Sequence, residues 1–231
     1  MSGIHFIGGE KGGVGKSVVA RLLAQYMIDH KIPFMGFDTD KSHGALLRYY
    51  SDFAAPSIID DYESLDKIVV LAAENPGMRI LVDLAAQTHQ PLSQWIEESG
   101  VLELTEELGI SINYWNVMDS GKDSVDLLGK LLNQYGTRLN YVLVLNQLRD
   151  DSFKILEDSG YKLKAVEMGA KIVNLKRLHS PVMTKIDGNS YSFWAATNKD
   201  SQTANSLSLL ERQRIKMWLQ NAYKEIDSIS I

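Results

Sequence analysis

A glycine-rich segment near the start of the chain ends in a lysine and a hydroxyl side chain. It reads Gly9-Glu10-Lys11-Gly12-Gly13-Val14-Gly15-Lys16-Ser17. Its glycines let backbone N–H groups turn inward around phosphate oxygens, and a helix beginning near Lys16 aims its positive end at them. Lys16 is suited to neutralise β- and γ-phosphate charge, and the Ser17 hydroxyl to ligate Mg²⁺. We expect the nucleotide phosphates to lie against Gly12, Gly13, Val14, Gly15, Lys16 and Ser17.

The segment departs at one point from the general pattern G-x-x-x-x-G-K-[ST] of phosphate-binding loops. Glu10 occupies the position of the first glycine, and Gly9 lies one place upstream. A glycine-rich turn without a ligand is the alternative interpretation. The Lys-Ser pair directly after Gly15, at a strand-to-helix junction, argues against it.

Carboxylates follow two further apolar segments. Residues 34–37 end at Asp38, which Thr39 and Asp40 follow, and residues 79–82 end at Asp83. Because open α/β sheets bind ligands at the carboxyl ends of their strands, these side chains are candidates for the same site. The alternative for Asp38 and Asp40 is capping of a helix over residues 41–50.

Short apolar segments alternate with helical stretches, which predicts an α/β fold with a mostly parallel twisted sheet and helices on both faces. Expected strands are 4–7, 34–37, 79–82, 110–117, 141–145 and a weaker one at 163–166. Expected helices are 17–30, 125–135, a short one near 171–178 and a last one over 204–226. The length of 231 residues suits a single domain, 1–231.

Composition excludes several classes of function. The chain has no cysteine, so it forms no disulfide and no thiolate-ligated metal or iron–sulfur site. A net charge of −5 argues against a wholly basic protein that coats nucleic acid. No apolar run is long enough to span a membrane, and the chain enters its first strand without a secretory leader. We expect a cytoplasmic location.

Residues Lys11 to Ser17 resemble the K-G-G-x-G-K-[ST] loop of the ParA/MinD group, the deviant Walker A class of P-loop ATPases. That group carries an extra lysine early in the loop, here Lys11, which reaches across a nucleotide-sandwich dimer to the partner's phosphates. The resemblance therefore implies an ATP-dependent homodimer. Glu10 is compatible with this resemblance, because the group tolerates residues other than glycine at that position.

The resemblance continues through Asp38-Thr39-Asp40, which is similar to the D-x-D switch of the group. It implies that Asp40 orients or deprotonates the attacking water and that Asp38 lies near the Mg²⁺ shell. Asp83 is similar to the Walker B aspartate, which holds Mg²⁺ through water. The turn after it, 84–87, reads Leu-Ala-Ala-Gln in place of a turn with proline or glycine, so the behaviour of this switch stays open.

Asn146, before Gln147, resembles the asparagine that contacts adenine in the group, although an asparagine at a strand end is also a common turn or cap residue. A GTPase would need an N-K-x-D motif here, and the sequence Asn146-Gln147-Leu148-Arg149 lacks its aspartate. ATP is therefore preferred over GTP. The resemblance is specific for residues 1 to about 90 and rests on topology beyond them.

Two charged stretches suggest partners. Residues 162–185 hold six basic residues against Glu167, which could bind DNA phosphates non-specifically or could be a solvated helical face. The basic residues are Lys162, Lys164, Lys171, Lys176, Arg177 and Lys185. An acidic segment, 97–107, could contact a basic partner or simply be solvated.

The last helix carries an apolar stripe at helical spacing. Its residues are Leu207, Leu210, Ile215, Trp218, Leu219 and Tyr223. The stripe fits a membrane-targeting helix or a helix docked on its own domain. We expect docking and no stable membrane insertion, because acidic residues balance the basic ones nearby.

These features predict a weak ATPase that uses ATP and Mg²⁺ to switch a homodimer. The expected setting is plasmid partition, plasmid stability or conjugative DNA transfer, with a protein partner that stimulates hydrolysis. Two alternatives remain: an ATP-dependent synthetase of the same superfold, and a scaffold that binds ATP with little hydrolysis.

Overall fold

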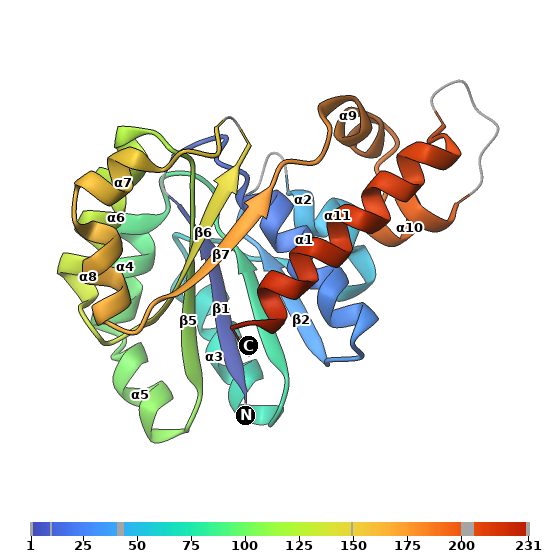
Figure 1. Cartoon of the computed structure of the whole chain (residues 1–231). Coiled ribbons are helices and arrows are strands. Elements are labelled where there is room, and N and C mark those ends of the chain that lie inside the picture. The colour runs from blue at the N-terminus through green and yellow to red at the C-terminus, as the bar shows by residue number, and fades with distance from the viewer. Residues whose placement is uncertain (1, 10, 41–43, 149, 200–205, 230–231) are drawn as a thin grey trace.

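The fold is built on one parallel sheet, shown by a computed structural model that describes residues 2–9, 11–40, 44–148, 150–199 and 206–229. Within them the sheet has seven strands in the order β3-β2-β4-β1-β5-β6-β7, and every neighbouring pair is parallel (Figure 1). The strands are β1 (Gly3–Gly8), β2 (Phe34–Asp38), β3 (Ala54–Pro56), β4 (Arg79–Asp83), β5 (Ser111–Met118), β6 (Asn140–Gln147) and β7 (Lys171–Lys176). The predicted α/β class is confirmed.

Helices cover both faces of the sheet (Figure 1). One face carries α3 (Tyr62–Glu74), α4 (His89–Glu98), α5 (Val101–Glu107), α6 (Lys122–Tyr135), α7 (Lys154–Asp158) and α8 (Tyr161–Glu167). The other carries α1 (Lys16–Asp29), α2 (Ala45–Tyr49), α9 (Ser180–Gly188), α10 (Phe193–Asn198) and α11 (Leu209–Asp227). A short 3-10 helix, η1 (Ser51–Phe53), precedes β3.

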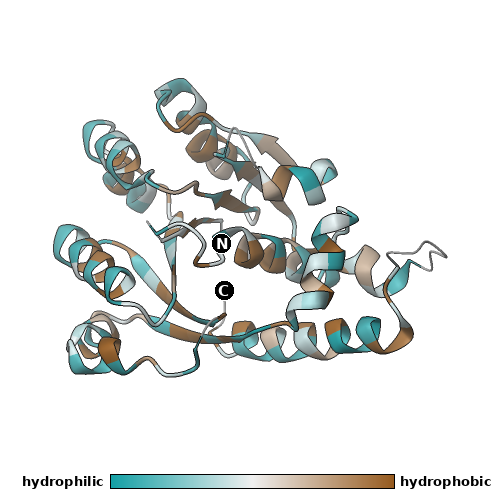
Figure 2. Ribbon diagram, turned by 90° about the horizontal axis from the view of Figure 1, so that it is seen from above, coloured by the Kyte–Doolittle hydropathy of each residue, from teal (hydrophilic) through white to brown (hydrophobic). Residues whose placement is uncertain are grey.

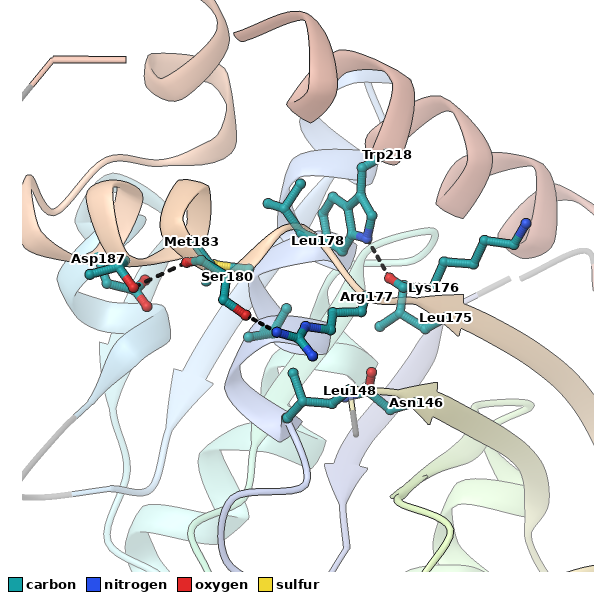
Figure 3. Close-up of a pocket in the computed structure, with 13 residues that line it drawn as sticks. Asn146, Leu148, Leu175, Lys176, Arg177, Leu178, Ser180, Met183, Asp187 and Trp218 are labelled. Atoms are coloured by element: carbon teal, nitrogen blue, oxygen red, sulfur yellow. Dashed lines mark hydrogen bonds between the residues drawn. The ribbon is translucent and has the colours of Figure 1, made fainter. Parts of the chain in front are cut away.

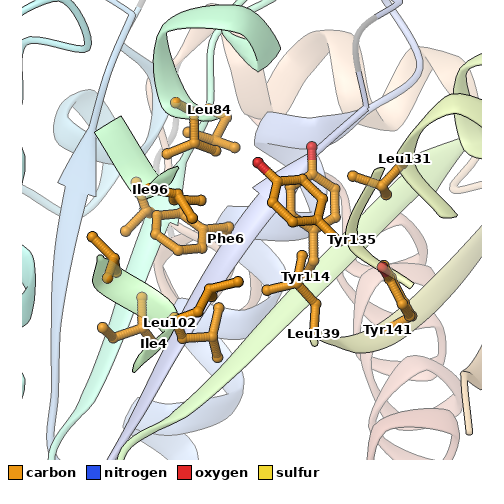
Figure 4. Packing of buried hydrophobic residues seen from close by; sticks show 14 of the residues in the cluster. Ile4, Phe6, Leu84, Ile96, Leu102, Tyr114, Leu131, Tyr135, Leu139 and Tyr141 are labelled. Atoms are coloured by element: carbon orange, nitrogen blue, oxygen red, sulfur yellow. The ribbon is translucent and has the colours of Figure 1, made fainter. Parts of the chain in front are cut away.

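Alternating side chains of each strand supply the two cores, as the two-residue repeat of a strand requires. On β1, Ile4 and Phe6 enter the core beneath α3 and α4, whereas Ile7 enters the core beneath α1 and α11. Figure 4 shows Ile4 and Phe6 packed with Leu84, Ile96 and Leu102. Seen from above, apolar residues gather on the sheet and on the helix sides that face it (Figure 2).

Two predicted elements at the end of the chain are wrong. The predicted strand 163–166 lies in helix α8, and the predicted helix near 171–178 is mostly strand β7. On β7, Val173 and Leu175 are buried while Lys171, Asn174 and Lys176 are exposed, which is the alternation of an edge strand. On α8 the apolar side chains of Leu163 and Val166 are exposed, so they do not mark a buried strand.

The other predicted strands, 4–7, 34–37, 79–82, 110–117 and 141–145, match β1, β2, β4, β5 and β6, and the helices 17–30 and 125–135 match α1 and α6. Strand β3 and the helices α3, α4, α5, α7, α9 and α10 were not predicted. Glu10, residues 41–43, Arg149 and residues 204–205 of the predicted last helix lie outside the described residues.

The last helix is docked on its own sheet, as expected. Ile215, Trp218 and Leu219 of α11 are buried, and Tyr223 donates a hydrogen bond to Asp29 of α1 at 2.8 Å. Leu210 is an exception in the predicted stripe, since 66% of it is exposed. Among the described helices, none combines the length and apolar character needed to span a membrane.

A buried histidine lies in the middle of the sheet. His5 of β1 is 1% exposed and accepts a hydrogen bond at Nδ1 from Trp115 Nε1 of β5, at 3.1 Å. Its Nε2 has no hydrogen-bond partner. Burial, with a smaller effect from Arg79, lowers the pKa of His5 to about 3 from its usual 6.5. The ring is therefore neutral in the folded protein near neutral pH.

This histidine should make the fold sensitive to acid. The unfolded chain binds a proton on this ring below pH 6.5, whereas the folded chain binds it only near pH 3. The free energy of unfolding is therefore highest above pH 6.5 and decreases as the pH falls toward 3. We expect His5→Gln, whose amide can still accept from Trp115, to flatten the slope of unfolding free energy against pH by up to about 1.4 kcal/mol per pH unit. Urea unfolding between pH 4 and 7 measures this. The exposed His179→Gln is the control, and equal slopes for both variants would contradict the interpretation.

Candidate nucleotide site

The glycine-rich loop joins the carboxyl end of β1 to the start of α1 at the centre of the sheet. Gly13 and Gly15 have φ values of +74° and +99°, which side chains rarely allow. A Cβ atom added to Gly15 would overlap Nδ2 of Asn146, so this glycine is also required by space. Asn146 Nδ2 donates to the carbonyl of Val14 at 2.7 Å and thereby ties β6 to the loop.

A cleft of about 490 Å³ lies over this loop, and we call it the loop cleft. It brings together Lys16, Ser17, Asp40 and Asp83, which the sequence analysis had selected from three separate segments. Gly12, Gly13 and Gly15 complete its floor. Lys16 is 8% exposed, and its Nζ donates to the carbonyls of Gly9 at 2.7 Å and Lys11 at 3.1 Å. The cleft therefore joins a cation, a hydroxyl and carboxylates, the groups that a magnesium-bound phosphate requires.

Two buried carboxylates lie side by side at the edge of this cleft. Asp38 and Asp83 end the paired strands β2 and β4 at the same register position, and each is 3% exposed. Asp38 accepts hydrogen bonds from the backbone N–H groups of Asp40, at 3.0 Å, and Leu47, at 3.1 Å. Burial raises the pKa of Asp38 against the effect of these bonds.

The Asp83 carboxylate lacks a hydrogen bond that its burial would call for. Its Oδ1 is buried without a hydrogen-bond partner. Burial and the neighbouring Asp38 raise the pKa of Asp83 to about 8, although the Ser17 hydroxyl and Lys16 oppose that shift. An orphaned carboxylate oxygen beside a serine hydroxyl and a second carboxylate is a donor set that fits a hard divalent cation such as Mg²⁺.

Thr39 is a structural link that the sequence interpretation missed. Its backbone N–H and its hydroxyl both donate to the carbonyl of Asp83, at 3.0 and 3.1 Å, and the hydroxyl accepts from Ala85 N–H at 2.9 Å. It therefore fastens the segment after β2 to the turn after β4. That turn closes with Gln87 at a φ of +62°, where glycine would be the unstrained choice.

A second pocket of about 210 Å³ adjoins the loop cleft, and we call it the side pocket (Figure 3). It shares Gly15, Val18 and Leu148 with the loop cleft. Its other walls are Asn146, the end of β7, helix α9 and Trp218 of α11, whose Nε1 donates to the Lys176 carbonyl at 2.6 Å. Most of this lining lies beyond residue 170, on β7, on α9, which was not predicted, and on α11, which was.

The basic stretch 162–185 does not form one face. Lys162 and Lys164 lie on α8, whereas Lys185 lies on α9 across the sheet. Lys162 pairs with Glu157 at 2.9 Å, Lys164 donates to Asn133 at 2.6 Å, and Lys185 pairs with Glu211 at 2.9 Å. Lys171, Lys176 and Arg177 are the exposed cations along and after β7. In the acidic segment, Glu97 and Glu103 pair with Arg138.

The chain is similar over almost its whole length to known bacterial proteins. The chain is 24% identical to the protein TraL of Escherichia coli over the full length of both, and 22% identical to the protein MobD of Acidithiobacillus ferrooxidans over 98% of this chain and 97% of that one. Its structure superposes on MinD cell division protein of Aquifex aeolicus with a TM-score of 0.54 and 12% identity, covering 97% of this chain and 98% of MinD. In a MinC:MinD complex from the same organism the TM-score is 0.56. No protein-family model matches the chain.

The chain has the ParA/MinD-type fold. The resemblance inferred from Lys11 to Ser17 and from the two strand-end aspartates is thereby confirmed. The individual roles of the site residues stay predictions.

The lysine that marks ParA/MinD-type loops is held within its own chain. Lys11 Nζ lies 3.1 Å from Oδ2 and 3.4 Å from Oδ1 of Asp119, and 3.8 Å from Asp123. Burial raises the pKa of Asp119, but hydrogen bonds from Ser124, Lys11 and Gly121 outweigh it and hold the pKa below its usual range. Asp119 was not among the predicted site residues, although it follows β5 directly, as Asp38 and Asp83 end β2 and β4.

We expect this ion pair to stabilise the protein without nucleotide. The Asp119 side chain is 6% exposed, so Lys11→Ala leaves a nearly buried carboxylate without its cation and should cost about 1–3 kcal/mol of unfolding free energy. A double-mutant cycle with Asp119→Ala in urea measures the coupling. Arg138→Ala is the matched control, since its exposed pair with Glu103 should cost less than about 1 kcal/mol. A Lys11 cost no larger than the Arg138 cost would refute the pairing.

Proposed function

We propose that this chain binds Mg-ATP and acts as a slowly hydrolysing dimerisation switch in conjugative DNA transfer. The observation that carries the proposal is the pair of adjoining pockets that share Gly15, Val18 and Leu148. The loop cleft holds Lys16, Ser17, Asp40 and Asp83 beside the glycines of the loop. The side pocket combines apolar walls, which include Leu175, Met183 and Trp218, with polar and charged groups at Asn146, Lys176, Arg177, Ser180, Thr184 and Asp187. A nucleotide likewise has two parts, a polyanion and a planar base, joined at a short distance.

The loop cleft would receive the triphosphate. Lys16 would neutralise the β- and γ-phosphates, with the loop N–H groups and the positive end of α1 around them. Ser17 and Asp83 would hold Mg²⁺, with Asp38 beside them, and the ion would supply neutralisation of the phosphate charge. Asp40, which lines the cleft, would orient or deprotonate the attacking water.

The side pocket would receive the adenine. Asn146 lines it, but its Nδ2 is engaged by the Val14 carbonyl, so this residue would support the base together with the loop. Leu148, Leu175, Met183 and Trp218 give the apolar walls that a base requires.

Dimerisation would come from Lys11. To reach the phosphates of a second copy, its Nζ must exchange Asp119 and Asp123 for a stronger anion. A triphosphate in the partner supplies that anion, whereas a shorter polyphosphate supplies less charge. This exchange would make the dimer depend on the nucleotide state.

The setting in conjugative transfer is supported by full-length similarity to TraL and MobD. Non-specific DNA binding is part of the proposal only through the exposed Lys171, Lys176 and Arg177, of which Arg177 also donates to Ser180. Lys162, Lys164 and Lys185 are engaged with other side chains of the chain. A protein partner would complete the site and stimulate hydrolysis, as for switches of this type.

A scaffold that binds ATP with little hydrolysis is the second candidate. It is favoured by the turn after Asp83, whose Leu84, Ala85 and Ala86 line the loop cleft without a polar side chain. Turnover with and without DNA and a partner separates the two candidates.

The switch is tested by comparing wild type with three variants. Lys16→Ala should weaken ATP affinity in the presence of Mg²⁺ by about 30-fold or more, since it removes a charged partner of the phosphates. Lys11→Ala should bind ATP but stay monomeric, and Asp40→Ala should accumulate the ATP-bound dimer because hydrolysis no longer dissolves it. Calorimetry measures the affinity for ATP, and light scattering after size exclusion measures the mass of the monomer or dimer.

The exposed Lys130→Ala on α6 is the matched control and should behave as wild type. Wild-type protein with no magnesium-dependent affinity for ATP would overturn the proposal. A mass that is independent of nucleotide, with rapid turnover of a small carboxylate substrate, would favour the synthetase alternative.

A further inference from the structure

A buried arginine lies on α1 just beyond the glycine-rich loop. Arg21 is 3% exposed, and its Nη1 donates to Asp187 Oδ1 of α9 at 2.8 Å. Its Nε and Nη2 are buried without a hydrogen-bond partner. The guanidinium lies over the Tyr49 ring, with Cζ 3.7 Å from the ring centroid, and 5.1 Å from that of Phe193. Burying a guanidinium with only one ion pair and two aromatic contacts costs free energy. Packing alone therefore does not explain the position of Arg21.

Arg21, Asp187 and Tyr49 form a cluster that joins three helices. Arg21 belongs to α1, Asp187 to α9 and Tyr49 to α2. The Tyr49 hydroxyl also donates to Asp187 Oδ1, at 3.2 Å. Asp187 therefore receives one hydrogen bond from α1 and one from α2, and neither helix can shift relative to α9 without losing one of them.

The α9 end of the cluster is a wall of the side pocket. Ser180, Met183, Thr184 and Asp187 all line that pocket, and Figure 3 shows Met183, Ser180 and Asp187 along the same helix. A group bound in the side pocket must contact α9 and so constrain the position of Asp187.

The α2 end of the cluster reaches the carboxylates of the loop cleft. Leu47 of α2 donates its N–H to Asp38 Oδ2 at 3.1 Å, two residues before Tyr49. Asp38 in turn pairs in register with Asp83. A displacement of α2 therefore changes the hydrogen bonding of a carboxylate that lies beside the orphaned oxygen of Asp83.

We propose that Arg21 is a positioning residue that couples occupancy of the side pocket to the carboxylates of the loop cleft, through Asp187 and Tyr49. This inference rests on the proposed function. It predicts that a base in the side pocket strengthens the effect of Mg²⁺ on phosphate binding. Arg21 and Tyr49 line neither pocket, so their substitution tests the coupling without removing a ligand contact.

The experiment measures dissociation constants for ATP and for inorganic tripolyphosphate, each with Mg²⁺ and with a chelator. The gain in affinity from Mg²⁺ for ATP, divided by the gain for tripolyphosphate, is the coupling factor. We expect a factor of about 5 or more in wild type, the lower range for coupled sites. Arg21→Met, which keeps length without charge, should bring it to about 1, and Tyr49→Phe should lower it partway.

The control is Arg138→Met, just before the amino end of β6, which should keep the wild-type factor. If Arg21 serves packing alone, Arg21→Met weakens both ligands equally and leaves the factor unchanged, which would overturn the inference. A wild-type factor of 1 with normal magnesium-dependent ATP binding would overturn the inference and leave the proposed function standing. If wild type showed no magnesium-dependent ATP binding, both the inference and the proposed function would be overturned. If Arg21→Met does not fold, Tyr49→Phe decides, because it removes one hydroxyl only.

Discussion

The site depends on the parallel arrangement of the strands. Because all strands of the described sheet run in one direction, their carboxyl ends meet at one edge, and residues far apart in sequence are brought together there. Asp38, Asp83 and Asp119 end or follow three different strands, and the loop before Lys16 follows a fourth. Asp83 and the start of α1 thus line the same cleft, where a cation and an anion can bind together.

Local signals were sufficient to predict the part of the site that lies in consecutive residues. The loop from Gly12 to Ser17 and the strand-end aspartates carry their chemistry in short motifs, and the structure brings Lys16, Ser17, Asp40 and Asp83 into one cleft. Among the residues that line the side pocket, only Gly15 and Asn146 were selected from the sequence as nucleotide-binding residues. The walls of this pocket come from β6, β7, α9 and α11, and they face one another only because of tertiary packing.

The errors at residues 163–178 have the same physical origin. Helix α8 buries Ala165 and exposes Leu163, so its large apolar residues do not show which side of the helix packs against the core. Strand β7 lies at the edge of the sheet, and its exposed lysines obscure the two-residue repeat of Val173 and Leu175. An edge strand with charged outward positions avoids pairing with other chains, and this protective pattern makes it hard to recognise in a sequence.

The hydrogen bonds of Thr39 have a chemical consequence. They join the ends of β2 and β4, so the side chains of Asp38 and Asp83 are held as neighbours. Burial and the neighbouring Asp38 therefore favour a proton on Asp83, whose pKa is raised to about 8. A divalent cation bound beside Asp83 would displace this proton, so the fold couples metal binding to proton release.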